Sequence, residues 1–182
     1  MNRERKIAVL RGINVGGRRK ILMADLKQLF LKLGCRDVES YIQSGNVIFT
    51  SEKGNAELEK ELEAAILKQM KLDVPVILRS LEEWVQMIKA NPFYSKDSEI
   101  NSLYVTLLKE EPEKKHAQQL QNVHDGPDRF EIEGKNIFLE CAGKYYATKW
   151  SNHFFEKKLQ VQASSRNWKT VLKLAELADK GR

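Results

Sequence analysis

The chain has 182 residues, of which 42% are hydrophobic and 31% charged, and its formal net charge is +6. This composition is ordinary for a folded globular protein and excludes a disordered chain. No apolar run approaches the roughly 18 residues of a transmembrane helix, and the start of the chain turns polar too soon for a signal peptide, so we expect a cytoplasmic protein without a membrane partner.

The first 80 residues show a regular alternation of predicted elements. A strand is predicted over residues 5–12, and a glycine-rich connection leads into a helix that ends at Gly34. The segments DVESYIQ and NVIFT follow as two strands rich in β-branched and aromatic residues. We expect them to form a hairpin in which Ser44 and Gly45 are a two-residue turn.

A second helix and a fourth strand complete this half. Asn55 is predicted to cap a long helix, and Pro75 opens the strand VPVILRS, which suits the edge of a sheet. Ser80 and Glu83 form a capping box for the helix of a linking segment, residues 81–97. The order βαββαβ is that of a ferredoxin-like fold.

Residues 98–182 repeat part of this order. A strand SLYVTLL, a helix with Pro112 at its first position and a hairpin turning near Gly134 are predicted, and two more helices begin at Ser151 and after Asn167. No repeat is visible in the sequence itself. We therefore predict an α+β fold of two ferredoxin-like halves, with a C-terminal helix, from the order of the elements alone.

Cysteine and histidine usage encodes no metal site or cofactor site. Cys35 and Cys141 belong to no CxxC pair and are predicted to be buried, reduced thiols. His116, His124 and His153 fall in different predicted elements, without metal-ligand spacing. We expect neither a bound metal nor a cofactor.

Charge is unevenly distributed along the chain. Residues 1–20 carry seven basic side chains and one acidic side chain, and residues 144–182 carry nine basic and three acidic ones. Between them, 21 acidic residues face 15 basic ones. If the two basic ends meet in space, they predict a phosphate-bearing small molecule or a nucleic acid as partner; otherwise they are two unrelated solvated faces.

Several motifs occur in a fixed order over nearly the whole chain. They are RGINVGG at 11–17, MADL at 23–26, YIQSGNV at 41–47, NPF at 91–93 and SSRNWKTVLKLAEL at 164–177. This combination resembles the domain-of-unknown-function 1697 family. The resemblance implies two ferredoxin-like halves and no established reaction. Near the C-terminus Lys149 matches the family pattern, but Tyr146 and Ala147 replace its usual glycine and arginine, so an anion contact through that arginine is not expected here.

The glycine-rich connection has the glycine spacing of a Walker loop but not its chemistry. Arg18 and Arg19 occupy the positions of the lysine and the magnesium-binding hydroxyl residue, which excludes ATP hydrolysis of that type. Two interpretations stay open. The backbone NH groups could cradle an anion, or the glycines could only supply turn conformations with positive φ.

Topology predicts that this connection meets the first hairpin. In a βαββαβ half the first and second strands run parallel, so the connections after them share one end of the sheet. Polar groups on clustered loops are typical of binding sites. The candidate ligand-binding residues at this end are Arg11, Gly12, Asn14, Gly16, Gly17, Gln43, Ser44 and Asn46.

Three further candidates lie near the C-terminus. Lys149 is a candidate because it matches the family pattern. Arg166 and Asn167 precede the last helix, where they could bind an anion or only cap and anchor the helix. The sharpest expectation is that Arg166 and the glycine loop form one electropositive surface.

Function is not fixed by these observations. The leading hypothesis is an anion-binding protein. The alternatives are a small-molecule enzyme at the same loops, which lacks an evident general base, and an interaction module whose motifs are structural. Stacking of RNA on an open sheet is disfavoured, because KIAVL and NVIFT are apolar on both faces. Oligomeric state is not predicted.

Overall fold

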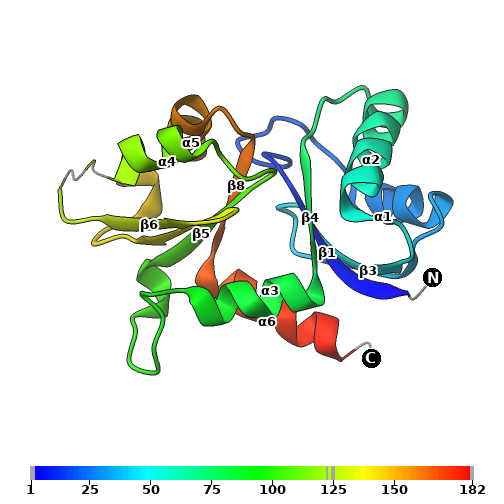
Figure 1. Cartoon of the computed structure of the whole chain (residues 1–182). Helices are drawn as coiled ribbons and strands as arrows, with labels where there is room; N and C mark the ends of the chain where they lie inside the picture. Colours follow the sequence, from blue (N-terminus) through cyan, green and yellow to red (C-terminus); the bar gives the residue numbers. More distant parts are fainter. Residues whose placement is uncertain (1–2, 122, 124–125, 181–182) are drawn as a thin grey trace. The chain divides into compact units, whose positions relative to one another are not determined.

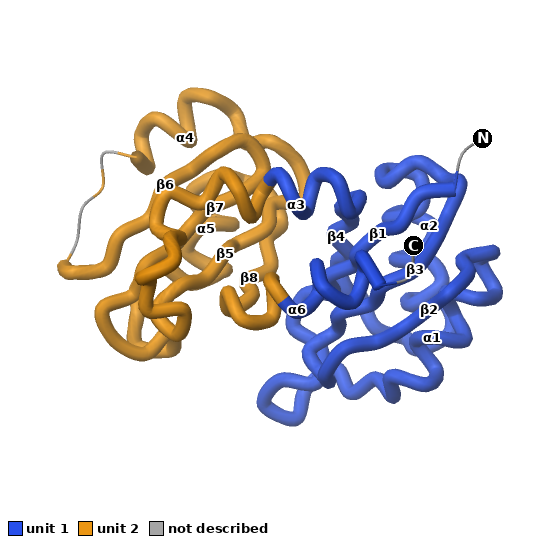
Figure 2. Tube along the Cα trace, turned by 90° about the horizontal axis from the view of Figure 1, so that it is seen from below, with its two compact units in different colours: residues 1–86, 173–182 blue, residues 87–172 orange. Residues whose placement is uncertain are grey.

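The computed structural model describes residues 3–121, 123 and 126–180 (Figure 1). The chain divides into two compact units, Met1–Gln86 with Lys173–Arg182 and Met87–Leu172 (Figure 2). The boundaries between them fall inside two helices, α3 (Leu81–Ala90) and α6 (Trp168–Asp179). Each unit contains one four-stranded antiparallel sheet, which confirms the predicted α+β fold of two ferredoxin-like halves.

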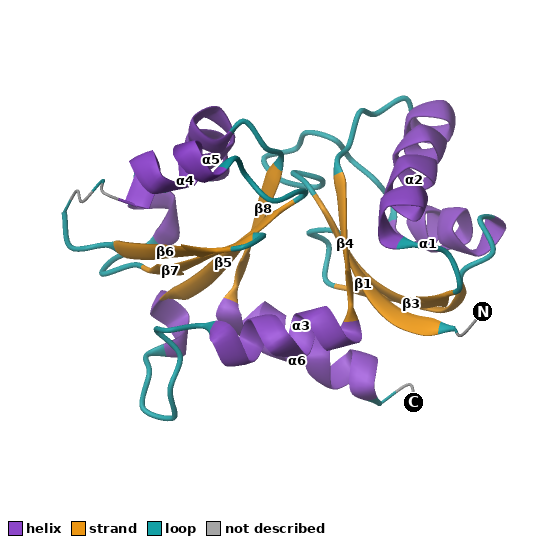
Figure 3. Cartoon of the chain, viewed as in Figure 1, coloured by secondary structure: helices purple, strands orange, loops and turns teal. Residues whose placement is uncertain are grey.

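The first half follows the predicted order of elements. Its elements are β1 (Glu4–Leu10), α1 (Met23–Lys32), β2 (Arg36–Tyr41), β3 (Asn46–Ser51), α2 (Asn55–Met70) and β4 (Val76–Ser80). The strands lie in the order β2-β3-β1-β4, and β1 is antiparallel to both its neighbours. Helices α1 and α2 lie on one face of the sheet (Figure 3). Strand β4 is an edge strand, as its proline predicts.

The core of this half lies between the sheet and its two helices. Alternate strand residues such as Ala8 and Phe49 face the helices, and the rings of Phe30 and Phe49 meet edge to face with centroids 5.1 Å apart. The intervening residues Ile7 and Ile48 are also fully buried. The central strands are therefore buried on both faces, as their apolar sequences predict, and expose no aromatic platform for bases.

The second half has the same strand order, β6-β7-β5-β8. Its elements are η1 (Ile100–Ser102), β5 (Leu103–Leu108), α4 (Lys114–Gln121), β6 (Arg129–Glu133), β7 (Asn136–Glu140), η2 (Tyr145–Ala147), α5 (Asn152–Leu159) and β8 (Ala163–Asn167). Helices α4 and α5 lie on one face of the sheet (Figure 3). Their core is aromatic, with the rings of Phe130 and Trp150 4.7 Å apart.

The two halves repeat each other in detail. Ile7 of β1 pairs with Arg79 of β4, and Val105 of β5 pairs with Arg166 of β8. Each arginine is buried and donates from Nη1 to the carbonyl oxygen of the preceding residue at 2.8 Å. A duplication that is invisible in the sequence is thus clear in strand register and hydrogen bonding.

The helices that follow the two fourth strands are also capped alike. Ser80 Oγ accepts from the backbone NH of Glu83 at 3.1 Å, and Glu83 Oε2 accepts from the NH of Ser80 at 2.7 Å, so the predicted capping box is confirmed. In the second half, Asn167 Oδ1 accepts from the NH of Thr170 at 2.8 Å. Each cap directly follows a buried arginine.

Local predictions were wrong at several element ends. Strand β2 ends at Tyr41, so four residues, 42–45, connect it to β3, and the turn is not formed by Ser44 and Gly45 alone. The reason is that Ile42 has a φ of 50° and leaves the ladder early.

Two helix starts were also wrong, and one strand was missed. Helix α2 has Gly54 as its N-cap, and the Asn55 side chain is instead held by Lys6 Nζ at 2.7 Å. Helix α4 begins at Lys114, after Pro112. The strand Ala163–Asn167 was not predicted, because its two serines break the apolar pattern that marks a strand.

Candidate functional site

The loop rim, residues 11–22 and 42–46, lies at one end of the first sheet. Strands β1 and β2 are both antiparallel to β3 and therefore parallel to each other, so the connections after them emerge together, as predicted. The backbone NH of Leu10 donates to the carbonyl oxygen of Gly45 at 2.8 Å, and that of Arg11 donates to Pro75 at 3.0 Å. Three connections therefore meet at this edge.

The glycines at the tip of the first loop form a tight hairpin turn. The NH of Arg18 donates to the carbonyl oxygen of Val15 at 3.1 Å, across Gly16 and Gly17. Both glycines have positive φ, 59° and 74°, which is the requirement of a type I′ turn. The turn conformation therefore explains why glycine occupies both positions. Both glycines are exposed at the tip of the rim.

Asn14 fastens the two loops of the rim to each other. Its Nδ2 donates to the carbonyl oxygens of Ile21 at 2.9 Å and Gln43 at 2.8 Å, and its Oδ1 accepts from the NH of Ile21 at 2.8 Å. Asn14 also has a φ of 55°, which asparagine tolerates better than most residues. Its amide is thus engaged within the protein and positions the loops.

Two buried residues, Gly45 and Asn46, hold the second loop of the rim in place. Asn46 is fully buried and donates from Nδ2 to the carbonyl oxygen of Tyr41 and to Ser44 Oγ, each at 3.1 Å. Gly45 lies directly against the first strand, where an added Cβ would come within 2.8 Å of Leu10 and Ile13. This close approach explains the glycine, and the Gln43 side chain remains exposed.

The exposed part of the rim is basic. Its first loop carries Arg11, Arg18, Arg19 and Lys20, and neither loop contains an acidic residue. Arg18 and Lys20 are exposed, while Arg19 Nη1 lies 3.3 Å from the carbonyl oxygen of Arg11 and closes the loop. Two of the four cations are therefore directed to solvent.

Apolar side chains accompany these cations. Val15, Leu22 and Ile42 are 62%, 71% and 49% exposed. The rim therefore combines positive charge with apolar contact area, a combination that suits a ligand with both anionic and apolar parts.

The three C-terminal candidates belong to the second unit. Arg166 lies in β8 and is buried; burial lowers its pKa to about 10, and its Nη1 donates to Ser164 Oγ at 2.9 Å. Asn167 caps α6, and Lys149 is exposed between η2 and α5. Eight of the eleven candidates are thus brought together at the loop rim. Because Arg166 is buried, its side chain does not contribute to an exposed electropositive surface, and a surface shared by the rim and the exposed Lys149 stays a prediction.

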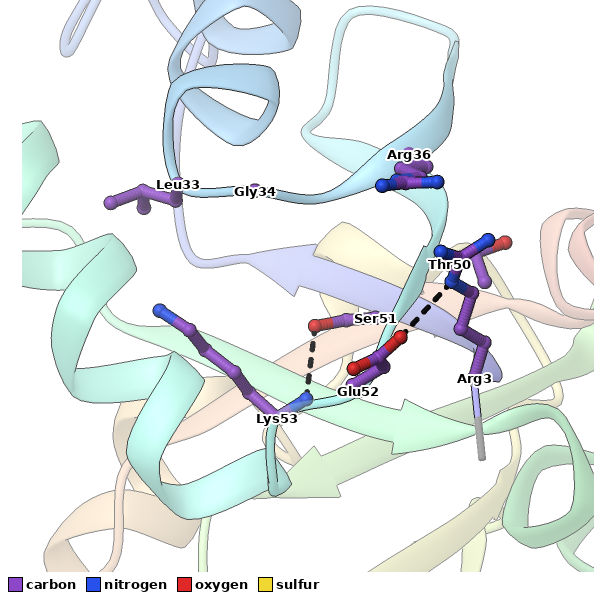
Figure 4. Close-up of a pocket in the computed structure, with 8 residues that line it drawn as sticks. All are labelled: Arg3, Leu33, Gly34, Arg36, Thr50, Ser51, Glu52 and Lys53. Carbon is purple, nitrogen blue, oxygen red and sulfur yellow. Dashed lines mark hydrogen bonds and ion pairs between the residues drawn. The ribbon is translucent and has the colours of Figure 1, made fainter. Parts of the chain in front are cut away.

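Sequence reasoning missed a pocket at the opposite end of the first sheet (Figure 4). This cationic pocket has a volume of about 230 Å³ and is lined by Arg3, Leu33, Gly34, Arg36, Thr50, Ser51, Glu52 and Lys53. Its residues come from the start of β1, the α1–β2 connection and the end of β3. The sequence could have predicted this pocket, because β1 and β2 run parallel and their first residues therefore lie at the same end of the sheet as the end of β3.

The described residues contain no group of three or more histidine, cysteine, aspartate or glutamate side chains arranged to hold a metal ion. None of the helices in the described part of the chain is both long and apolar enough to cross a bilayer.

These features define an α+β protein of two ferredoxin-like halves with a basic loop rim. Residues 3–138 match the model of a family described as a protein of unknown function, DUF1697, and the chain belongs to this family. The chain is similar to the solved structure of the conserved bacterial protein SP0830 from Streptococcus pneumoniae, with 26% identity, a TM-score of 0.75, and coverage of 97% of this chain and 99% of that one. No curated protein matches the sequence.

Proposed function

We propose that the chain binds a phosphate-bearing anion through the loop rim, either a nucleotide-like molecule or nucleic-acid phosphate. The observation that carries this proposal is the concentration of four cations on the loop 11–22, with no carboxylate on either of the two loops that Asn14 holds together. A preorganised cationic surface attracts anions without an ordering cost at binding.

Each part of the rim has its own role in this proposal. Arg18 and Lys20 supply charge-assisted hydrogen bonds to phosphate oxygens. The exposed backbone at Gly16 and Gly17 lets a ligand approach closely, and the Gln43 amide offers both a donor and an acceptor. Asn14 positions the loops and does not itself contact the ligand.

The two competing functions have weaker support. An enzyme at the same rim would need a general base, and the loops 11–22 and 42–46 contain no acidic residue and no histidine. An interaction module is favoured by the exposed Val15, Leu22 and Ile42, but the surrounding cations are not required for it. Anion binding accounts both for the positive charge of the rim and for the Asn14 hydrogen bond that joins its two loops.

A thermal-shift screen against nucleotides, sugar phosphates and short oligonucleotides tests the proposal. A ligand that binds only the folded protein increases the free energy of unfolding by RT ln(1 + [L]/Kd) and therefore raises the Tm. We expect a rise with at least one phosphate-bearing compound and none with its dephosphorylated counterpart. Equal shifts with both compounds, or none with any, would contradict anion binding.

The cytoplasm is the compartment that we propose for this activity. Cys35 and Cys141 are both free and buried in their own cores. Free thiols stay reduced in a reducing compartment such as the cytoplasm, which also contains phosphorylated metabolites and nucleic acids.

A further inference from the structure

We propose that the cationic pocket is a second anion site, which takes the phosphate group of a small metabolite and is independent of the loop rim. The two sites lie at opposite ends of the seven-residue strand β1, roughly 20 Å apart at the rise of an extended strand.

Strand register brings the polar groups of this pocket together. Arg36 of β2 pairs with Thr50 of β3, and Glu4 of β1 pairs with Ser51, so the start of β1 and the end of β3 are adjacent. Figure 4 shows Arg3, Arg36 and Lys53 among the lining residues, with Arg3 paired to Glu52 and Ser51 Oγ accepting from the backbone NH of Lys53. Directly paired residues of neighbouring strands share one face of a sheet, so Arg36 and Thr50 place a guanidinium and a hydroxyl side by side for the acceptor oxygens of a phosphate group.

The charge balance of the pocket favours an anion. Glu52, its only acidic lining residue, pairs with Arg3 at 3.1 Å. Lys53 pairs with Glu61 of α2, and this hydrogen bond raises the pKa of the lysine, which therefore stays charged at neutral pH. Arg36 has no ion-pair partner within the described part of the chain, so at least one cation is available to a ligand.

Two features that could make the pocket negative are neutralised. In the last turn of α1, the carbonyl oxygens of residues 29–31 accept from the backbone NH groups of Leu33, Gly34 and Cys35. Burial raises the pKa of the Cys35 thiol to about 11, so this group carries no charge at neutral pH.

The size of the pocket restricts the ligand. Pockets for drug-sized molecules begin at about 300 Å³, and this one measures about 230 Å³. It therefore suits a phosphate on a small organic group and not a nucleotide, which separates its ligand from that of the loop rim.

Titration of the ¹⁵N-labelled protein with inorganic phosphate, at constant ionic strength, tests the site. We expect saturable shifts of the amides of Gly34, Ser51 and Lys53. Arg36→Gln should weaken phosphate binding at least about tenfold, the loss of one charge-assisted hydrogen bond. Glu52→Gln should strengthen it severalfold, since it removes the lining carboxylate and releases Arg3.

Lys60→Gln, an exposed change on α2 outside the pocket, is the matched control and should leave phosphate affinity unchanged. Arg18→Glu at the loop rim should also leave it unchanged, so failure of the rim proposal and failure of this one give different results. Non-saturable shifts, or an Arg36→Gln protein that binds phosphate as tightly as the Lys60→Gln protein, would overturn the proposal.

Discussion

Asn14 and Gln43 are 29 residues apart in sequence and are joined by a 2.8 Å hydrogen bond from the Asn14 side chain to the Gln43 backbone carbonyl oxygen. The bond ties the connection after β1 to the connection after β2. Because the same side chain also brackets Ile21, it fixes both ends of the basic hairpin. The shape of the loop rim therefore depends on one amide.

Replacing Asn14 should destabilise the protein even when the new residue adopts the positive φ of this position without strain. Asn14→Gly keeps the positive φ accessible but removes three hydrogen bonds, so we expect the free energy of unfolding to fall by about 1–3 kcal/mol. Urea denaturation measures this. Gln43→Ala is the control, because it retains the backbone carbonyl and should cost under about 0.5 kcal/mol. Wild-type stability of Asn14→Gly would show that the fastening contributes nothing.

Gly45 should tolerate no side chain. A Cβ there would lie within 2.8 Å of Leu10 and Ile13 at a φ of 83°. Left-handed strain of about 1–2 kcal/mol and overpacking of about 1–3 kcal/mol predict that Gly45→Ala loses roughly 2–5 kcal/mol in a denaturant titration.

Gly34→Ala separates the two causes. Gly34 also has a positive φ, 86°, but a Cβ there meets no atom within 4 Å. It should show the strain alone, about 1–2 kcal/mol. If both variants lost the same amount, close packing under Gly45 would play no part.

The sequence predicted the first half well because its elements follow simple periodic rules. Continuous apolar runs marked β1 and β3, helical spacing of apolar residues marked α2, and the parallel relation of β1 and β2 placed the two loops at one edge. The end of β2 was misplaced because Ile42, a β-branched residue, adopts a left-handed conformation that its sequence does not favour.

The second half was predicted less completely because tertiary context decides its last strand. Residues 163–167 contain Ser164, Ser165 and Arg166, which do not follow an apolar strand pattern, yet all five residues pair with Tyr104–Leu108 of β5. The cationic pocket escaped prediction for a similar reason. Its lining residues are scattered along the first 53 residues, and only strand register brings them together.

Asn167 should behave as a helix cap. Its Oδ1 accepts from the NH of Thr170, so Asn167→Ala should lower the free energy of unfolding by about 1 kcal/mol, whereas Asn167→Asp keeps the acceptor and should cost little. Thermal denaturation compares the two. Ser80→Ala at the equivalent position of the first half should match Asn167→Ala. An alanine variant as stable as the aspartate variant would remove the capping role.

Alkaline pH should destabilise the protein through its two thiols. Burial raises the pKa of Cys35 and of Cys141 from 9.0 to about 11. Above pH 9 the unfolded chain loses these protons while the folded chain keeps them, so stability falls as pH rises toward 11. Urea titrations across this range measure the slope, which Cys35→Ala together with Cys141→Ala should flatten. An unchanged slope would assign the effect to other groups.

Charge reversal at the loop rim tests the central claim most directly. Arg18→Glu combined with Lys20→Glu changes two exposed cations and spares Arg19, which closes the loop. Lys60→Glu with Lys68→Glu, on the exposed side of α2, changes the net charge equally and is the matched control.

Binding of ATP and of a short single-stranded oligonucleotide is then measured at about 50 mM and about 200 mM NaCl. We predict that the rim variant loses at least about tenfold in affinity at low salt and much less at high salt, because exposed charges are screened over about 10 Å near 0.1 M. A steep salt dependence confined to the oligonucleotide would assign the rim to nucleic acid. Equal losses in the rim variant and the α2 control, or no loss in either, would contradict an anion site at the loop rim.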